Sequence, residues 1–141
     1  MLKQNPSQSA IPNGKLPLNL SSILLVEIDR KLRDSRRLLL GTLEYPVLAI
    51  GGYTDLCRLS AESNCCLVAI DISHSEQEAV RIAAHARRTW PNAKILLLGR
   101  PSEEFDDPLY DDAVDAHYNP SGLVDAVYRL LGKESASNSS D

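Results

Sequence analysis

A continuous apolar run that ends in a single carboxylate constrains this chain more than any other stretch. Residues 65–70 read Cys-Cys-Leu-Val-Ala-Ile, and Asp71 follows them directly. The run is too short for most helices and lacks the alternation of a half-exposed strand, so it predicts a strand buried on both faces, as in a parallel sheet. Asp71 then lies at the carboxyl end of that strand, where open α/β sheets place their ligands and chemistry.

Four more strands, with helices between them, are predicted from the apolar patterning. The expected strands cover residues 22–27, 45–50, 94–98 and 116–118. Strand and helix alternate five times, which is typical of a parallel sheet with helices on both faces. Pro108 interrupts the acidic connection before the fifth strand, so any helix there is expected to be short or irregular. The sequence therefore predicts one doubly wound α/β domain with five βα units.

The two ends of the chain differ in composition from this domain. Residues 1–21 are rich in Pro, Ser, Asn and Gln, and residues 133–141 are rich in Ser. Such compositions bury too little apolar surface to order themselves. We expect a flexible arm over residues 1–21, the domain over 22–132 and a disordered tail over 133–141.

The first expected helix has an apolar stripe and a basic face. Asp29 is suited to be its N-cap. The inward stripe is formed by Leu32, Leu39, Leu40 and Leu43. The basic side chains are expected on an outer, solvated face, and they are Arg30, Lys31, Arg33, Arg36 and Arg37.

Charge and composition exclude several classes of partner. The net charge of the 141 residues is -4, and there is one Trp and one Phe. Neither nucleic acid nor an anionic membrane surface is therefore an expected partner. The N-terminus lacks an apolar signal region, and no apolar stretch reaches the ~20 residues that cross a bilayer. These observations predict a cytoplasmic protein.

No arrangement typical of an enzyme is visible in the sequence. Gly51 and Gly52 follow a strand but belong to no GxGxxG or GxxxxGK pattern. No nucleophile with an evident base is present, and the fold class alone predicts no catalytic activity. We therefore expect a protein without enzymatic activity.

Three landmarks connect the chain with a known family. Glu27 ends the first expected strand, residues 67–72 read Leu-Val-Ala-Ile-Asp-Ile, and Asn119 and Pro120 close the fifth strand. In these landmarks and their spacing, the chain resembles bacterial response-regulator receiver domains. The resemblance implies a flavodoxin-like sheet of order 2-1-3-4-5 and transfer of a phosphoryl group from a sensor kinase to Asp71. It also implies Mg²⁺ near Glu27 and Asp71, which would neutralise the carboxylates and the incoming phosphate.

Four positions depart from the receiver pattern. Ile28 stands where receivers carry a second acidic residue, and it offers no oxygen to a hard cation. The other three replace the Thr or Ser of the fourth strand, the switch aromatic of the fifth and the conserved lysine, and they are Gly99, Ala116 and Asn119. Electrostatic contacts such as those lost at Ile28 and Asn119 are often worth about 3–4 kcal/mol each. Mg²⁺ is therefore expected to bind weakly or not at all.

Two interpretations of Asp71 stay open from the sequence. Asp71 is the phosphoacceptor candidate of a conventional phosphorelay receiver with Mg²⁺, or it belongs to a degenerate receiver that works through protein–protein interaction. The losses favour the degenerate form. Without the lysine, Glu27 and Asp71 are expected to repel, which raises the pKa of one or recruits a cation.

The resemblance also implies partners for the chain. A receiver of either form binds another signalling protein, either a sensor kinase or a downstream effector. Receivers also form homodimers through the face that includes the fifth strand and the last helix, and the resemblance implies such a dimer here.

Overall fold

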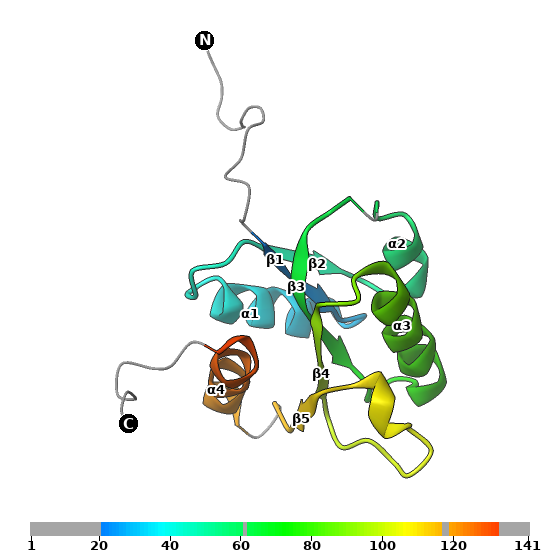
Figure 1. Cartoon of the computed structure of the whole chain (residues 1–141). Helices are drawn as coiled ribbons and strands as arrows, with labels where there is room; N and C mark the ends of the chain where they lie inside the picture. Colours follow the sequence, from blue (N-terminus) through cyan, green and yellow to red (C-terminus); the bar gives the residue numbers. More distant parts are fainter. Residues whose placement is uncertain (1–20, 61, 117–118, 133–141) are drawn as a thin grey trace.

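A five-stranded parallel sheet forms the centre of the computed structural model, which describes residues 21–60, 62–116 and 119–132 (Figure 1). Its order is β2-β1-β3-β4-β5. The strands are β1 (Ser22–Val26), β2 (Val47–Ile50), β3 (Cys65–Asp71), β4 (Lys94–Leu98) and β5 (Asp112–Val114). The α/β class and the parallel sheet that the sequence predicts, and the order 2-1-3-4-5 that the resemblance implies, are confirmed.

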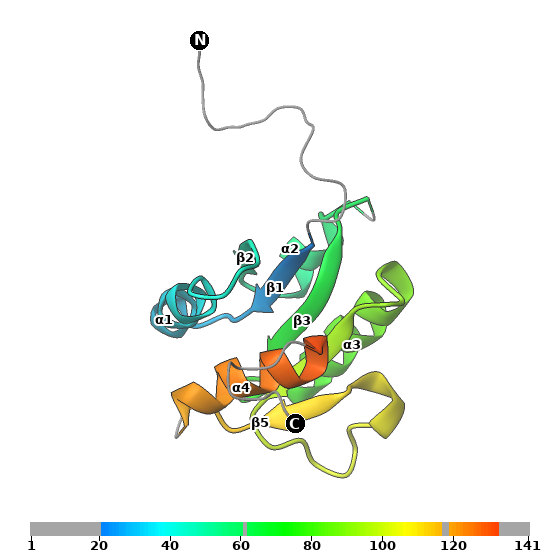
Figure 2. The same cartoon turned by 60° about the vertical axis from the view of Figure 1, so that its left-hand side comes forward.

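Helices cover both faces of the sheet (Figures 1 and 2). They are α1 (Arg30–Leu40), α2 (Tyr53–Cys57), α3 (Glu76–Thr89) and α4 (Pro120–Leu131). Helices α1 and α4 pack on one face, where Ile23 and Leu25 of β1 point, and α2 and α3 pack on the other with Leu24 and Val26. Because strand side chains alternate between faces, the apolar runs fill both cores.

The helix ends follow the capping preferences of the sequence in most places. Asp29 caps α1 by accepting hydrogen bonds from the backbone N–H of Lys31 and Leu32. Ser75 caps α3, and Gly132 ends α4 in the left-handed conformation, with φ 76°. The first position of α4 is Pro120, which lacks an N–H and is tolerated there.

The connection between β4 and β5 differs from the expected regular alternation. It holds one 3₁₀ turn, η1 (Asp107–Leu109), in place of a fourth α-helix. No regular helix forms across the acidic, proline-containing segment, and the short turn agrees with the prediction that any helix there is short or irregular. On its far side, the Asp111 carboxylate accepts hydrogen bonds from Ile95 N at 2.8 Å and from Arg87 Nη2 at 3.1 Å.

The predicted position of the fifth strand is wrong. The sequence placed it at residues 116–118, whereas β5 pairs with β4 through Leu96↔Asp112 and Leu98↔Val114. The contacts of Asp111 anchor the chain just before this strand, and its apolar content is too low to stand out in the sequence. Ala116 follows β5, and residues 117 and 118 lie outside the described part of the chain.

The register of the sheet brings two carboxylates to one edge. Val26 of β1 lies beside Ile70 of β3, so Glu27, which directly follows β1, and Asp71, the last residue of β3, lie side by side at the carboxyl end of the sheet. Backbone pairing continues for one residue, because Glu27 N donates to Ile50 O of β2 at 2.9 Å. The edge that the sequence predicts as the site therefore contains both side chains.

The flanking segments are not part of this description. Residues 1–20 and 133–141 lie outside the described residues, so the flexible arm and the disordered tail stay predictions. Within the described ranges, none of the helices combines the length and the apolar character needed to cross a membrane.

The central strands should dominate the stability of the fold. Leu96 on β4 is fully buried, whereas Leu48 on the edge strand β2 is 44% exposed. We predict that Leu96→Ala lowers the free energy of unfolding by about 2–5 kcal/mol, because it leaves a cavity in a packed core. Urea unfolding followed by circular dichroism measures this. Leu48→Ala is the matched control, and an equal loss in both variants would contradict the burial.

Candidate functional site

A buried arginine joins two carboxylates at the carboxyl edge of the sheet. The Arg36 Nη1 atom donates one hydrogen bond to Asp71 Oδ2 at 2.8 Å and another to Glu27 Oε1. The side chains of Arg36, Glu27 and Asp71 are 6%, 0% and 1% exposed. They come from α1, from the residue after β1 and from the end of β3. We call these three residues the Arg36 cluster.

The sequence predicts that Arg36 lies on a solvated basic face, and this prediction is wrong. Arg30, Lys31 and Arg37 are exposed as expected, but Arg36 is buried. The physical reason is helical spacing: Arg36 lies four residues after Leu32 and four before Leu40, so it shares their inward face. It is the functional residue that the sequence analysis missed.

Every oxygen of the Asp71 carboxylate has a hydrogen-bond donor. Oδ1 accepts from the backbone N–H and the hydroxyl of Ser73, both at 2.6 Å, and Oδ2 accepts from Arg36. Ser73 was not singled out in the sequence. A carboxylate held in this way is fixed in one orientation and shielded from solvent, which differs from a nucleophile that awaits a substrate.

The Glu27 carboxylate is engaged just as fully. Oε1 accepts from Arg36, and Oε2 accepts from the backbone N–H of Asp29 at 3.0 Å. His74 Nε2 lies 3.8 Å from Oε2, and Arg33 donates to the Glu27 carbonyl at 3.1 Å. The sequence predicts that two carboxylates without the family's lysine raise the pKa of one of them or recruit a cation. In the structure, that cation is a side chain of the protein itself.

The cluster separates the pKa values of its two carboxyl groups. Burial, together with the hydrogen bond to Asp71, raises the pKa of Glu27 to about 8. Burial also opposes ionisation of Asp71, but hydrogen bonds from Glu27, Ser73 and Arg36 outweigh it and hold the pKa of Asp71 below its usual range. The surroundings therefore favour the neutral form of the Glu27 carboxyl group and the ionised form of the Asp71 carboxyl group.

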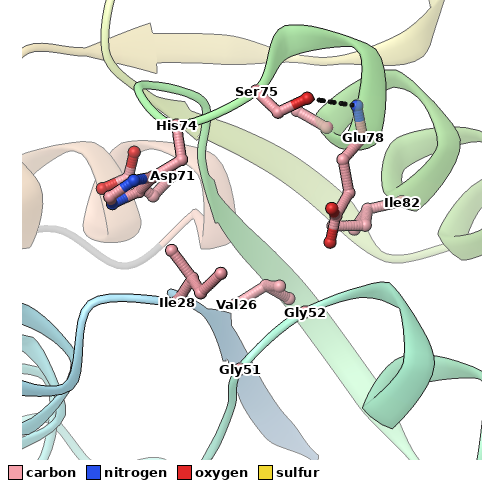
Figure 3. A pocket seen from close by; sticks show the side chains of 10 residues that line it. Val26, Ile28, Gly51, Gly52, Asp71, His74, Ser75, Glu78 and Ile82 are labelled. Atoms are coloured by element: carbon pink, nitrogen blue, oxygen red, sulfur yellow. Dashed lines mark hydrogen bonds between the residues drawn. The ribbon is translucent and has the colours of Figure 1, made fainter.

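A small pocket opens beside the cluster (Figure 3). Ile28, Gly51, Gly52, Asp71 and His74 form one side of it, and α3 supplies the other. Its volume is about 30 Å³, enough for one or two water molecules and too small for an organic ligand. Ile28 is 58% exposed and contributes an apolar wall where a receiver would offer a carboxylate.

The other departures from the receiver pattern have structural counterparts. Gly99 has φ +132°, and a Cβ there would lie 2.9 Å from Ile72 Cγ1, so the backbone does not favour Thr or Ser at this position. Ala116 is buried against the α4 face of the core. Asn119 is the N-cap of α4, where its side chain accepts from Gly122 N at 3.1 Å.

The residues at this edge do not fit the Mg²⁺ that the resemblance implies. A small divalent cation needs several oxygen ligands, but the oxygens of Glu27 and Asp71 already face Arg36 and backbone or hydroxyl donors. Ile28 supplies none. Across the described ranges, no group of three or more His, Cys, Asp or Glu side chains is arranged to hold a metal ion.

Comparison with known proteins identifies the fold. No protein-family model and no curated protein matches the chain. Among solved structures, the CheY-like receiver domain of Methanospirillum hungatei JF-1 is similar, with a TM-score of 0.71 and 22% identity over 81% of this chain and 95% of that one. The chemotaxis response regulator CheY4 of Vibrio cholerae gives 0.69 and 14%, over 80% and 100%.

A third neighbour was solved with a bound ligand. The response regulator TrrA of Thermotoga maritima, in complex with Mg(2+)-BeF, gives a TM-score of 0.66 and 24% identity, over 79% of this chain and 99% of that one. The coverage shows that the whole described domain corresponds to one receiver. The chain therefore has the receiver fold of response regulators, as the sequence predicted.

The proton on Glu27 makes stability depend on pH. Because the pKa of Glu27 is raised in the folded state, Glu27 contributes to the free energy of unfolding. This contribution is complete below about pH 4.5, the pKa of a free Glu, and it is lost as pH rises through about 8. Glu27→Gln mimics the protonated form and should remove this dependence. We predict that the free energy of unfolding of the wild type falls relative to that of Glu27→Gln between pH 5 and 9. The steepest fall is on the order of 1 kcal/mol per pH unit.

Urea midpoints measured at pH 5, 7 and 9 for both chains test this. The stabilising contribution of Asp71 depends on pH in the opposite direction, because the pKa of Asp71 is lowered. This contribution is complete above the pKa of a free Asp and is lost only as pH falls below that value. A wild type that gains stability relative to Glu27→Gln with rising pH would contradict the assignment.

Restoring the family's hydroxyl on the fourth strand should harm the fold. Gly99→Ser combines a positive φ with a contact to Ile72, whereas Gly132→Ser has a positive φ and open space. We predict losses of about 2–5 kcal/mol for Gly99→Ser and about 1–2 kcal/mol for Gly132→Ser. Thermal unfolding of the two variants measures the difference, and equal losses would argue against steric exclusion at Gly99.

Proposed function

We propose that this chain is a degenerate receiver domain of two-component signal transduction, which acts through protein–protein interaction without Mg²⁺-dependent phosphorylation of Asp71. The observation that supports this most directly is the state of the Asp71 carboxylate. It is 1% exposed, and both of its oxygens accept hydrogen bonds from Ser73 or Arg36. Similarity to receivers at 14–24% identity establishes the fold, and the function is inferred from this site.

The chemistry of phosphoryl transfer explains why this state matters. Asp71 would have to approach phosphorus as a free carboxylate, with cations neutralising the charge that gathers between them. Here the nucleophilic oxygens would have to give up charge-assisted hydrogen bonds, and the family's lysine position is the α4 N-cap Asn119. Transfer would therefore begin from a stabilised ground state and lack two of its usual electrostatic supports.

The neighbouring strands β4 and β5 support the same proposal at the same edge of the sheet, because Asp71 pairs with Leu98, the residue before Gly99. A receiver reports phosphorylation through its fourth-strand hydroxyl and fifth-strand aromatic, and this chain has Gly99 and Ala116 there. The element before β5 is the short turn η1. A chain that neither accepts the phosphoryl group nor moves these side chains would act by presenting a fixed surface to another signalling protein, a kinase or an effector.

A homodimer through β5 and α4 is one form that the proposed protein–protein interaction can take. Arg129 of α4 already pairs with Asp112 of β5 within the chain, with Nη2 and Oδ2 2.5 Å apart. These two charges are therefore satisfied internally, which favours contacts made by other side chains of this face.

Exposure to a small phosphodonor tests the proposed function. The chain is incubated with Mg²⁺ and acetyl phosphate, and separately with beryllofluoride, and is followed by intact mass and by amide NMR shifts. We expect no phosphoryl adduct and no shift at Asp71, because its oxygens are engaged. Asp71→Asn is the matched control, and a conventional receiver in the same mixture verifies the reagents. An adduct that disappears in Asp71→Asn would establish a conventional phosphorelay receiver.

A further inference from the structure

We propose that Arg36 is the resident cation of this site, and that removing its charge turns Glu27 and Asp71 into a binding site for a small divalent cation. The proposal deepens the proposed function, on which it rests, because it names what keeps the site closed. It follows from the disagreement between the metal that the fold implies and the side chains that are present.

The position of one nitrogen atom is the first argument. Nη1 of Arg36 alone contacts Oδ2 of Asp71 and Oε1 of Glu27. The guanidinium of Arg36 therefore lies between one carboxyl oxygen of Glu27 and one of Asp71. A cation that bridged the two groups would have to lie in the same place. A divalent cation and this guanidinium cannot occupy it together.

The burial of the cluster is the second argument. Glu27 and Arg36 are 1% and 5% exposed as whole residues, and buried charges persist only where they are paired. Without Arg36, two buried carboxyl groups would lose the cation that contacts both of them, and His74 Nε2, 3.8 Å from Glu27 Oε2, would adjoin only one. Such a pair gains stability from any cation small enough to enter.

The tether of Arg36 is the third argument. It belongs to α1, which is capped by Asp29 and anchored by the fully buried Leu40. Arg33, one turn earlier, donates to the Glu27 carbonyl from the same helix. A tethered cation competes with dissolved ions at a high effective concentration, so Mg²⁺ at cellular levels would have to displace a group that cannot diffuse away.

Mn²⁺ titration in the absence of any phosphodonor tests the proposal. Free Mn²⁺ is followed by electron paramagnetic resonance in the wild type, Arg36→Met, Arg36→Gln and Arg37→Met. We expect Arg36→Met and Arg36→Gln to bind one Mn²⁺ at least about tenfold more tightly than the wild type. Their unfolding temperatures should rise with Mn²⁺, because a ligand that binds only the folded state stabilises it.

The controls separate the site from the rest of the surface. Arg37→Met removes an exposed charge from the next position of α1 and should behave as the wild type. Arg36→Met combined with Glu27→Gln and Asp71→Asn removes the site and should bind no Mn²⁺. Arg36→Lys keeps a positive charge and should also stay closed.

Each outcome decides for or against the proposal. Unfolded Arg36→Met that is refolded by Mn²⁺ supports it. Failure of both Arg36→Met and Arg36→Gln to bind Mn²⁺ or to be refolded by it overturns it, and so does a wild type whose Mn²⁺ binding disappears in Asp71→Asn. Because no phosphodonor is present, these results are independent of an Asp71 adduct, which would overturn the proposed function instead.

Discussion

The carboxyl edge of this sheet depends on the neutralisation of two buried carboxyl groups. Parallel pairing of β1 with β3 forces Glu27 and Asp71 together, and burial makes a double negative charge there unfavourable. The Arg36 guanidinium contacts both carboxyl groups and offsets this cost, and the raised pKa of Glu27 favours the neutral form of that group. Buried ion pairs contribute little net stability relative to apolar packing, but they penalise alternative arrangements strongly. The Arg36 cluster therefore fixes how α1 lies against the strand ends.

Much of the fold could be predicted because the sequence repeats the same physical pattern. The apolar runs of β1, β3 and β4 lie between helices and must be buried on both faces, so their composition alone identifies them. The stripe from Ala79 to Trp90 on α3 and the cap at Ser75 follow helical geometry in the same direct way. In these segments, local preference and tertiary packing agree.

The prediction failed where tertiary contacts override local character. The strand β5 lies within an acidic segment, and pairing with β4 rather than apolar content selects it. Arg36 was assigned to solvent because it is charged, although its spacing from Leu32 and Leu40 placed it on the inward face. The position of Asp71 could be read from the sequence. The hydrogen bonds to its carboxylate could not be predicted, because only the fold brings Arg36 and Ser73 within reach of Asp71.

The same cluster limits how such a domain can change over generations. A substitution that opens this edge to a metal would begin with Arg36, whose loss leaves two buried carboxyl groups without the guanidinium that contacts both. Introducing an acidic residue at Ile28 first would add a third negative group beside them. At Gly99, the backbone and Ile72 oppose the returning hydroxyl. Each of these substitutions made alone is expected to give a less stable protein, so their effects would have to be tested in combination.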